Sequence, residues 1–436
     1  MKKTIFYTAA LAFLGLMGKA QEIKFEEYDL PNGLHIILHQ DNSAPVVTTS
    51  VMYHVGAKDE AESRTGFAHF FEHLLFEGTK NIGRGDWFKI VSANGGSNNA
   101  NTDPDRTYYY EVFPSNNEQL GLWMEAERMR QPIINQIGVD TQREVVKEEK
   151  RMRMDNQPYG NFFNVILTSL FKKHPYKGTV IGSIEDLNSA KLEEFNQFFK
   201  KYYIPNNAVL VVAGDIKPEQ TKKWINDYYG SIPKGTPIVR NFPKETPITS
   251  EMEETFYDKN IQIPAYLFGY RTPSSKERDA YVLDMLGNYL STGKSSVLYK
   301  KLVDNEKKAI EVQALNLNFV DYGIFAFFAL PMGETSKETL KKDIDAEIKK
   351  LQTELISEAD FQKLQNQMEN NFVNANSSSE AIAHSLAHNY LLKGDTNLIN
   401  KEIDIYRSIT REEMREVAKK YLNTNQRVII NYLPQK

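Results

Sequence analysis

The chain has 436 residues, more than one ordinary hydrophobic core accommodates, which suits two domains of roughly 200 residues each. Its 41% hydrophobic and 11% aromatic residues are typical of a folded globular protein, and a net charge of −4 without a basic stripe gives no reason to expect a nucleic-acid partner. The absence of cysteine excludes disulfides and thiolate ligands, so any metal site must use His, Asp and Glu.

Residues 1–20 have the pattern of a signal peptide. Two lysines precede an apolar run from Ile5 to Met17, and cleavage is predicted after Ala20. Cleavage leaves 50 basic and 57 acidic residues, a net charge of about −7. The run is shorter than the ~20 apolar residues of a spanning helix, so we expect a periplasmic or secreted protein with no integral membrane span. An uncleaved N-terminal anchor is the alternative.

The segments that follow predict strands. Residues 24–40 alternate like two strands joined by a Pro-Asn-Gly turn at 31–33, and residues 44–57 predict a third, β-branched strand. His35 and His39 share one strand face. No acidic residue accompanies them at ligand spacing, so we interpret them as ordinary strand residues.

The next segment, 66–76, places two histidines and a glutamate among phenylalanines and leucines. On a helix His69 and His73 stand one above the other with Glu72 beside them. The apolar neighbours predict burial, which costs on the order of 2–7 kcal/mol for each unpaired polar group. A divalent metal would remove that cost, and His-x-x-Glu-His is a spacing found in zinc peptidases. Hydrogen bonding to backbone at a helix end is the alternative.

A helix ending at a glycine pair and a strand pair at 97–114 come next. The small side chains of Asn99, Ala100 and Thr102 suggest that the first of these strands lies at a sheet edge. Beside a metal, such an edge can pair with an extended peptide. A plain hairpin is the alternative reading of the same pattern.

Helical periodicity then extends over residues 118–129 and 141–154. The second of these helices carries Glu144, Glu148 and Glu149, and any one of them could reach a metal held by the two histidines. Most charges on such a helix face water, so periodicity alone does not choose among the three.

The second half repeats the first. Residues 192–214 predict a helix, a turn and an apolar strand, and residues 411–433 match them without a gap at an offset of 219. Residues 231–250 contain four prolines and predict a linker. We therefore expect an α+β fold of two homologous αβ domains, 21–230 and 251–436, each a sheet with helices packed on it.

Two other motifs could indicate a different function. Gly287 and Gly293 resemble a phosphate loop, but five residues separate them instead of four and a helix precedes them, which disfavours nucleotide binding. His384 and His388 share a helical face with Glu380, but no carboxylate lies between them to act as a base. We interpret that segment as a packed or surface helix.

The helix at 66–76, together with residues 30–41, 98–102, 143–158 and 174–187, resembles the pitrilysin, insulinase and mitochondrial processing peptidase family, in particular its half-length bacterial branch. The resemblance covers nearly the whole mature chain. It implies half of a clamshell, because family members that close alone have four such αβ units. It also implies a zinc metallopeptidase with one zinc ion per chain.

The resemblance implies roles for individual residues. His69 and His73 correspond to zinc ligands and Glu72 to the general base. The third ligand follows the second histidine by 76 or 77 residues in a Val-Val-x-x-Glu frame, which Glu149 fits at 76. Glu148 is then expected to be solvated.

Substrate contacts and one departure follow from the same resemblance. Relatives bind substrate as an added strand beside an Asn-Ala-x-Thr segment, which implies main-chain contacts at Asn99 and Ala100, next to Thr102. The family usually has a glutamate seven residues before the third ligand, where this chain has Gln142. An amide carries no charge to support a zinc-bound histidine, so we expect lower metal affinity.

A second departure concerns an arginine and a tyrosine, seven residues apart, that hold substrate in relatives. Here Val303 and Ile310 occupy these positions. We therefore expect a peptide-cleaving endopeptidase that is the catalytic subunit of a heterodimer, its homologous partner supplying the pair; a homodimer is the alternative. A non-catalytic scaffold or peptide-binding subunit, or a dedicated processing peptidase, is the competing function. Intact Glu72 favours an enzyme.

Overall fold

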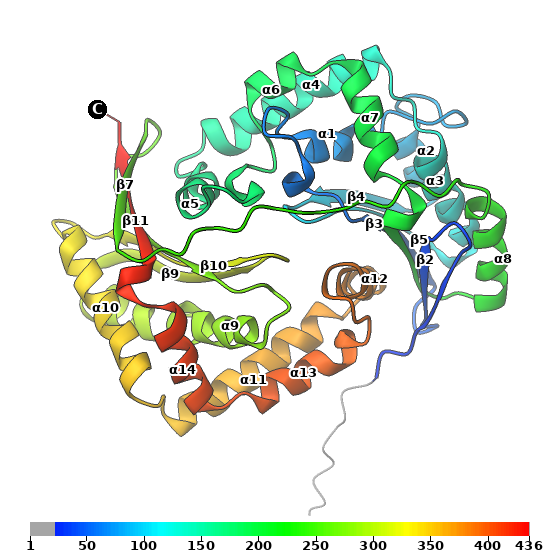
Figure 1. The fold of residues 1–436 in the computed structure, drawn as a ribbon. Helices are drawn as coiled ribbons and strands as arrows, with labels where there is room; N and C mark the ends of the chain where they lie inside the picture. Colours follow the sequence, from blue (N-terminus) through cyan, green and yellow to red (C-terminus); the bar gives the residue numbers. More distant parts are fainter. Residues whose placement is uncertain (1–21, 436) are drawn as a thin grey trace, which may run out of the picture.

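The computed structural model describes residues 22–435, so the predicted signal peptide lies outside the described residues. Two sheets with helices on both faces build the molecule (Figure 1). The first sheet has the order β1-β2-β6-β3-β5-β4 and the second the order β7-β11-β8-β10-β9. This is the predicted α+β fold of two homologous units.

The strands of the first sheet are β1 (Glu26–Asp29), β2 (His35–Gln40), β3 (Val46–Tyr53), β4 (Ser97–Thr102), β5 (Thr107–Pro114) and β6 (Ala208–Gly214). Those of the second are β7 (Met252–Asp258), β8 (Ala265–Thr272), β9 (Ala309–Asn318), β10 (Gly323–Pro331) and β11 (Arg427–Pro434).

The helices of the first half are α1 (Phe67–Leu74), α2 (Trp87–Ala93), α3 (Glu118–Arg130), α4 (Gln136–Lys150), α5 (Phe162–Leu170), α6 (Ile184–Ser189), α7 (Leu192–Tyr202) and α8 (Pro218–Tyr229). Those of the second half are α9 (Arg278–Ser291), α10 (Lys337–Thr353), α11 (Glu358–Ala375), α12 (Ser379–His388), α13 (Leu398–Ser408) and α14 (Arg411–Tyr421).

The internal repeat of the sequence is visible in the strand pairing. β6 runs parallel to β2 and antiparallel to β3, and β11 runs parallel to β7 and antiparallel to β8. Val209 lies opposite His35, and Val428, which the sequence match aligns with Val209, lies opposite Met252. The two sheets therefore share one topology, to which the first adds the edge strand β1.

Each half of the sequence supplies a helix that packs on the sheet of the other half. One face of the first sheet packs on α1, α3, α7 and α8, while the other face, with Ile37 and Val211, is covered by Ile382 and Leu386 of α12 (Figure 1). Conversely, Ile166 of α5 packs on the second sheet. Each half thus has a core of its own, and two further clusters of buried residues are shared between the halves.

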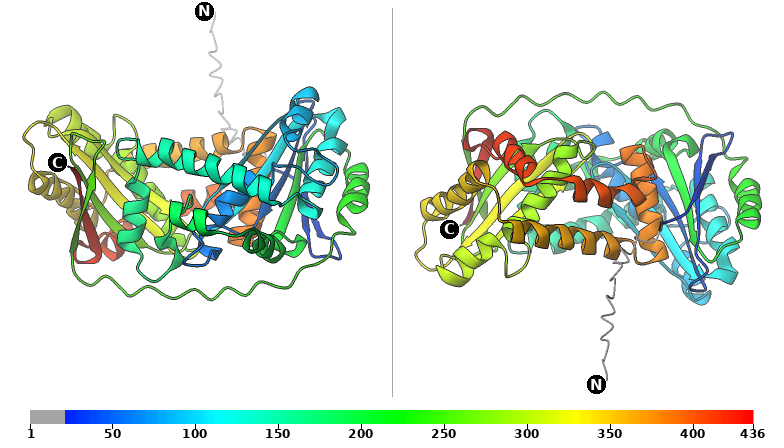
Figure 2. Two further views of the ribbon diagram at one scale, coloured as in Figure 1. Left: turned by 90° about the horizontal axis from the view of Figure 1, so that it is seen from above. Right: turned by 90° about the horizontal axis from the view of Figure 1, so that it is seen from below.

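The proline-rich segment between α8 and β7 contains neither helix nor strand and runs along the outside of the molecule (Figure 2). Val239 in its middle is 90% exposed. The same segment is still held at points along its length: Nε of Arg240, for example, lies 2.7 Å from the Asp59 carboxylate.

A buried ion cluster also joins the halves. Lys58 is 2% exposed, and its Nζ lies 2.7 Å from Oδ1 of Asp105 and 2.9 Å from Oδ2 of Asp321, on the turn between β9 and β10. Tyr176 donates a hydrogen bond of 2.6 Å to Asp105, and the backbone N–H of Val320 donates one of 2.8 Å. Because Asp105 lies on the β4–β5 turn, the cluster fixes that turn against the second half.

We predict that Asp321→Asn destabilises the fold in a pH-dependent way. Burial raises the pKa of Asp321, but His174 and the Lys58 ammonium outweigh burial and hold it below the usual value. Such a carboxylate stabilises the fold above its unfolded-state pKa of about 3.9, and this contribution is lost as the pH falls toward the folded-state pKa. At pH 7 we expect a loss of about 1–2 kcal/mol in the free energy of unfolding, since Asp321 keeps partial solvent access.

Urea unfolding at pH 7 and pH 3.5 measures this difference. It should be smaller at the lower pH, and Asp140→Asn, which removes an exposed carboxylate, serves as the control with little change at either pH. An equal loss at both pH values would contradict the assigned charge interaction.

Candidate metal centre

Helix α1 is held at its N-terminal end by backbone geometry and a buried carboxylate. Gly66 precedes it with φ of +89°, and a Cβ there would lie 2.6 Å from the carbonyl oxygen of Ile181. The Glu60 carboxylate accepts hydrogen bonds from the N–H groups of Gly66 (2.7 Å) and Ala68 (2.8 Å). These N–H groups lack a partner within the helix, so the Glu60 side chain satisfies two of them, although burial raises the pKa of its carboxyl group.

The C-terminal end of α1 is held by side chains from β5 and α3. Tyr109 donates a hydrogen bond of 2.8 Å to the carbonyl of Phe71. The fully buried guanidinium of Arg128 donates a hydrogen bond of 3.5 Å to the carbonyl of Leu75, which follows the helix. The same guanidinium lies 4.0 Å from the Trp87 ring centre and pairs with Glu111 and Glu125 at 3.0 Å each. The helix is therefore fixed at both ends by contacts that do not involve a metal.

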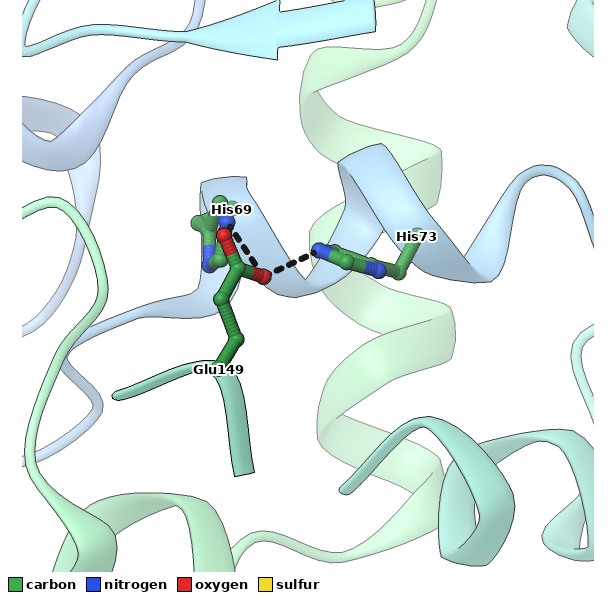
Figure 3. A group of neighbouring side chains, drawn as sticks. All are labelled: His69, His73 and Glu149. Atoms are coloured by element: carbon green, nitrogen blue, oxygen red, sulfur yellow. Dashed lines mark ion pairs between the residues drawn. The ribbon is translucent and has the colours of Figure 1, made fainter. Parts of the chain in front are cut away.

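Three side chains from α1 and α4 converge beside this helix (Figure 3). Nε2 of His73 lies 3.0 Å and Nε2 of His69 lies 3.6 Å from the same carboxylate oxygen, Oε2 of Glu149. Ligands about 2.1 Å from a tetrahedral zinc ion lie about 3.4 Å apart, so these spacings fit zinc. Within residues 22–435, no other group of His, Asp and Glu side chains meets at metal-binding distance.

The protonation states also suit a metal. Burial, with the charge of His73 second, lowers the pKa of His69 to about 4, so its imidazole is neutral near pH 7. Burial raises the pKa of Glu149, but its hydrogen bond with His73 and the nearby His69 outweigh that effect and lower it. Neutral imidazoles and an ionised carboxylate are the forms that bind metals.

Glu72 lies beside the three converging side chains without joining them. Oγ1 of Thr102, on β4, donates a hydrogen bond of 2.7 Å to its carboxylate. Burial raises the pKa of Glu72, and the Thr102 hydrogen bond opposes that rise. Thr102, predicted as a substrate contact, therefore has a partner in the protein: its side chain orients Glu72.

Strand β4 borders the site as an edge strand. It is the last strand of its sheet and pairs with β5, Asn99 opposite Tyr110 and Ala100 opposite Tyr109. The predicted edge strand is thus present. Its free side faces a cavity of about 750 Å³. The cavity is lined by His69, Glu72, His73, Asn99, Ala100, Asn101, Thr102, Glu149, Arg153, Met154, Gly160, Phe163, Asn164, Leu167, Thr179, Val180 and Ile181.

The remaining predicted residues lie as follows. Gln142 donates a hydrogen bond of 2.6 Å to Glu77, so the partner that the structure gives it is a carboxylate and not a histidine. Glu148 is exposed and pairs with Arg151. Val303 packs against the core of the second half, and Ile310 on β9 is 44% exposed; neither lines the cavity.

Sequence reasoning missed Arg153. Its Nη1 lies 2.8 Å from Oε1 of Glu149, the oxygen that does not face the histidines. The signal was available, because residue 153 follows Glu149 by one helical turn. The apolar cavity wall from α5, with Phe163 and Leu167, had no such signal, since it depends on how α5 packs on the second sheet.

Comparison with known proteins assigns the chain to a family. The model of insulinase, peptidase family M16, matches residues 35–183, and the model of the peptidase M16 inactive domain matches residues 189–368. The chain belongs to peptidase family M16. The predicted resemblance is thereby confirmed, and the half that matches the inactive domain contains none of the three converging side chains.

Several family M16 proteins match most of the chain. The zinc protease PqqE of Helicobacter pylori is 29% identical over 429 residues, 97% of this chain and 96% of that protein. An uncharacterised zinc protease of Mycobacterium tuberculosis is 26% identical over 405 residues, 90% of each chain. Both of these relatives are named as zinc proteases.

Solved structures show the same fold. A protease from H. pylori superposes with a TM-score of 0.88 at 28% identity, over 95% of this chain and 100% of that one. The periplasmic protease PqqL from Escherichia coli gives a TM-score of 0.77 at 18% identity and is covered over 48% of its length. The M16 chain described here therefore corresponds to about half of PqqL. No helix within residues 22–435 is long and apolar enough to cross a membrane.

Proposed function

We propose that this chain is an exported zinc-dependent endopeptidase that cleaves peptides or short unfolded polypeptides. The observation that carries the proposal is the convergence of His69, His73 and Glu149 within 4.8 Å of one another, with Glu72 beside them in a cavity. Two imidazoles and a carboxylate are the ligand set of catalytic zinc sites such as those of thermolysin and carboxypeptidase A.

Zinc held by His69, His73 and Glu149 would activate a water molecule and polarise the scissile carbonyl. Glu72 is the general base: it takes a proton from the attacking water and returns it to the leaving amine. The hydrogen bond from Thr102 keeps the carboxylate in one orientation for both transfers. Its raised pKa brings its proton affinity closer to the working pH, which suits a group that must take and release a proton.

The substrate adds a strand to the first sheet. The free side of β4 offers backbone groups at Asn99 and Ala100, and an extended peptide pairing there passes along the cavity. Pairing through the backbone tolerates many side chains, which favours a broad peptidase over a processing peptidase dedicated to one substrate. The intact base and ligand set argue against a scaffold without catalytic activity.

We propose that a homologous subunit completes the site. The side chains of Val303 and Ile310 have no hydrogen-bonding groups, so they cannot hold a peptide carbonyl. The correspondence of this chain with half of PqqL supports a second unit of the same fold. A heterodimer whose partner supplies an arginine and a tyrosine fits best, with a homodimer as the alternative. The predicted leader and the description of PqqL as periplasmic support a periplasmic location.

Glu72→Gln tests the base. We expect the variant to keep its zinc, because Glu72 is not among the three ligands, and to lose at least about 100-fold in kcat on a quenched fluorescent peptide. Glu148→Gln, which removes an exposed carboxylate on α4, should match wild type in both respects. Undiminished cleavage by Glu72→Gln would show that another group takes the proton.

The partner is tested by mixing. The purified chain alone should cleave the peptide slowly, and addition of a homologous subunit with Arg and Tyr at the positions of Val303 and Ile310 should raise kcat/KM. Size-exclusion chromatography should show a complex of the two chains. Full activity of the chain alone, unchanged by the added subunit, would refute the heterodimer.

A further inference from the structure

Arg153 lines the metal cavity, and the proposed mechanism gives it no role. It lies on the turn Arg151–Asp155 that continues α4, and its side chain is 76% exposed although it lines the cavity. Nη1 pairs with Oε1 of Glu149 at 2.8 Å. A guanidinium has five N–H donors, so most of them stay available to another acceptor.

The neighbouring cations on this turn are paired elsewhere. Lys150 lies 2.6 Å from Asp155, and Arg151 lies 3.0 Å from Glu148, which is not among the cavity residues. Arg153 differs from both, because its carboxylate partner is a proposed metal ligand. Binding of a divalent cation at Glu149 would weaken that ion pair, since the cation competes for the charge of the same carboxylate.

When a divalent metal is bound, the charges around the cavity leave the positive charge of Arg153 without a balancing negative charge. The carboxylates and the guanidinium that line the cavity belong to Glu72, Glu149 and Arg153, and imidazoles such as those of His69 and His73 bind metals in the neutral form. A divalent cation balances the two carboxylates and leaves the positive charge of Arg153. An acidic group entering this cavity would meet a guanidinium without competition from a second lining cation.

We propose that Arg153 is a specificity-determining residue that binds a carboxylate of the peptide substrate, either an acidic side chain or a free C-terminus. This inference rests on the proposed peptidase function. The guanidinium touches the ligand Glu149, and an extended peptide advances roughly 3.3 Å per residue, so the carboxylate recognised belongs to a residue within about two positions of the scissile bond. The planar fork of arginine matches a carboxylate with two parallel hydrogen bonds.

Binding to the zinc-loaded full chain carrying Glu72→Gln, assembled with the homologous partner subunit, tests the proposal without turnover. The probes are fluorescein-labelled peptides of one sequence with a C-terminal amide and either Glu or Gln at successive positions near the centre, plus the Gln peptide shortened to end there in a free carboxylate. Fluorescence anisotropy should show that the best Glu or free-carboxylate peptide binds at least about tenfold tighter than the Gln amide. Which of the two is preferred distinguishes a side chain from a C-terminus.

Substitutions of Arg153 in the same background identify the residue responsible. Arg153→Gln should bring the acid-to-amide affinity ratio to about one, and Arg153→Glu should reverse it. Arg151→Gln is the matched control, because Arg151 lies on the same turn but pairs with Glu148 outside the cavity; it should keep the wild-type ratio. Zinc content should stay constant in all of these variants.

Three results would overturn the inference. The first is no saturable binding of the acidic peptides, and the second is an acid-to-amide affinity ratio near one with Arg153 intact. The third is that Arg153→Gln loses zinc and binds all of the peptides equally more weakly. The last result would mean that Arg153 only positions Glu149. Cleavage of the Gln peptide by wild type with its partner subunit, measured in parallel, tests the peptidase function separately, because cleavage with a ratio of one refutes only the specificity.

Discussion

The structure depends on the placement of two imidazoles, the buried His69 and the half-buried His73, on one face of a short apolar helix. His69 and His73 are placed there by α1. Glu60 binds the N-terminus of this helix, and Tyr109 and the buried Arg128 bind the carbonyls of Phe71 and Leu75 at its C-terminal end. Burying polar ring nitrogens without partners is costly, and the Glu149 carboxylate on α4 lies next to Nε2 of both rings. The proposed metal at their meeting point would bind all three groups together.

The site also depends on the packing of a helix from each half on the sheet of the other half. Leu167 of α5 contributes both to the cavity wall and to the core beneath the second sheet, so the wall is positioned by strands more than a hundred residues away in sequence. The ion cluster of Lys58, Asp105 and Asp321 joins the β4–β5 turn to the second half. The second half thus supports the geometry of a site to which it contributes no proposed ligand.

Local features of the site could be predicted from sequence, and long-range ones could not. The relation of His69, Glu72 and His73 follows from helical spacing, and the fold class follows from strand patterns and the internal repeat. Glu149 could not be chosen from Glu144 and Glu148 by periodicity, because all three lie on one helix; the family resemblance chose it, and the structure shows the other two exposed. The Thr102–Glu72 hydrogen bond and the Glu77 partner of Gln142 depend on packing between elements, which the sequence does not display.

The most direct test of this account is an anomalous difference map at the zinc absorption edge from crystals of the purified full chain. The account predicts one strong peak about 2.0–2.2 Å from Nε2 of His69, Nε2 of His73 and a carboxylate oxygen of Glu149. A map with no peak at this position, or with the zinc bound through other residues, would contradict it.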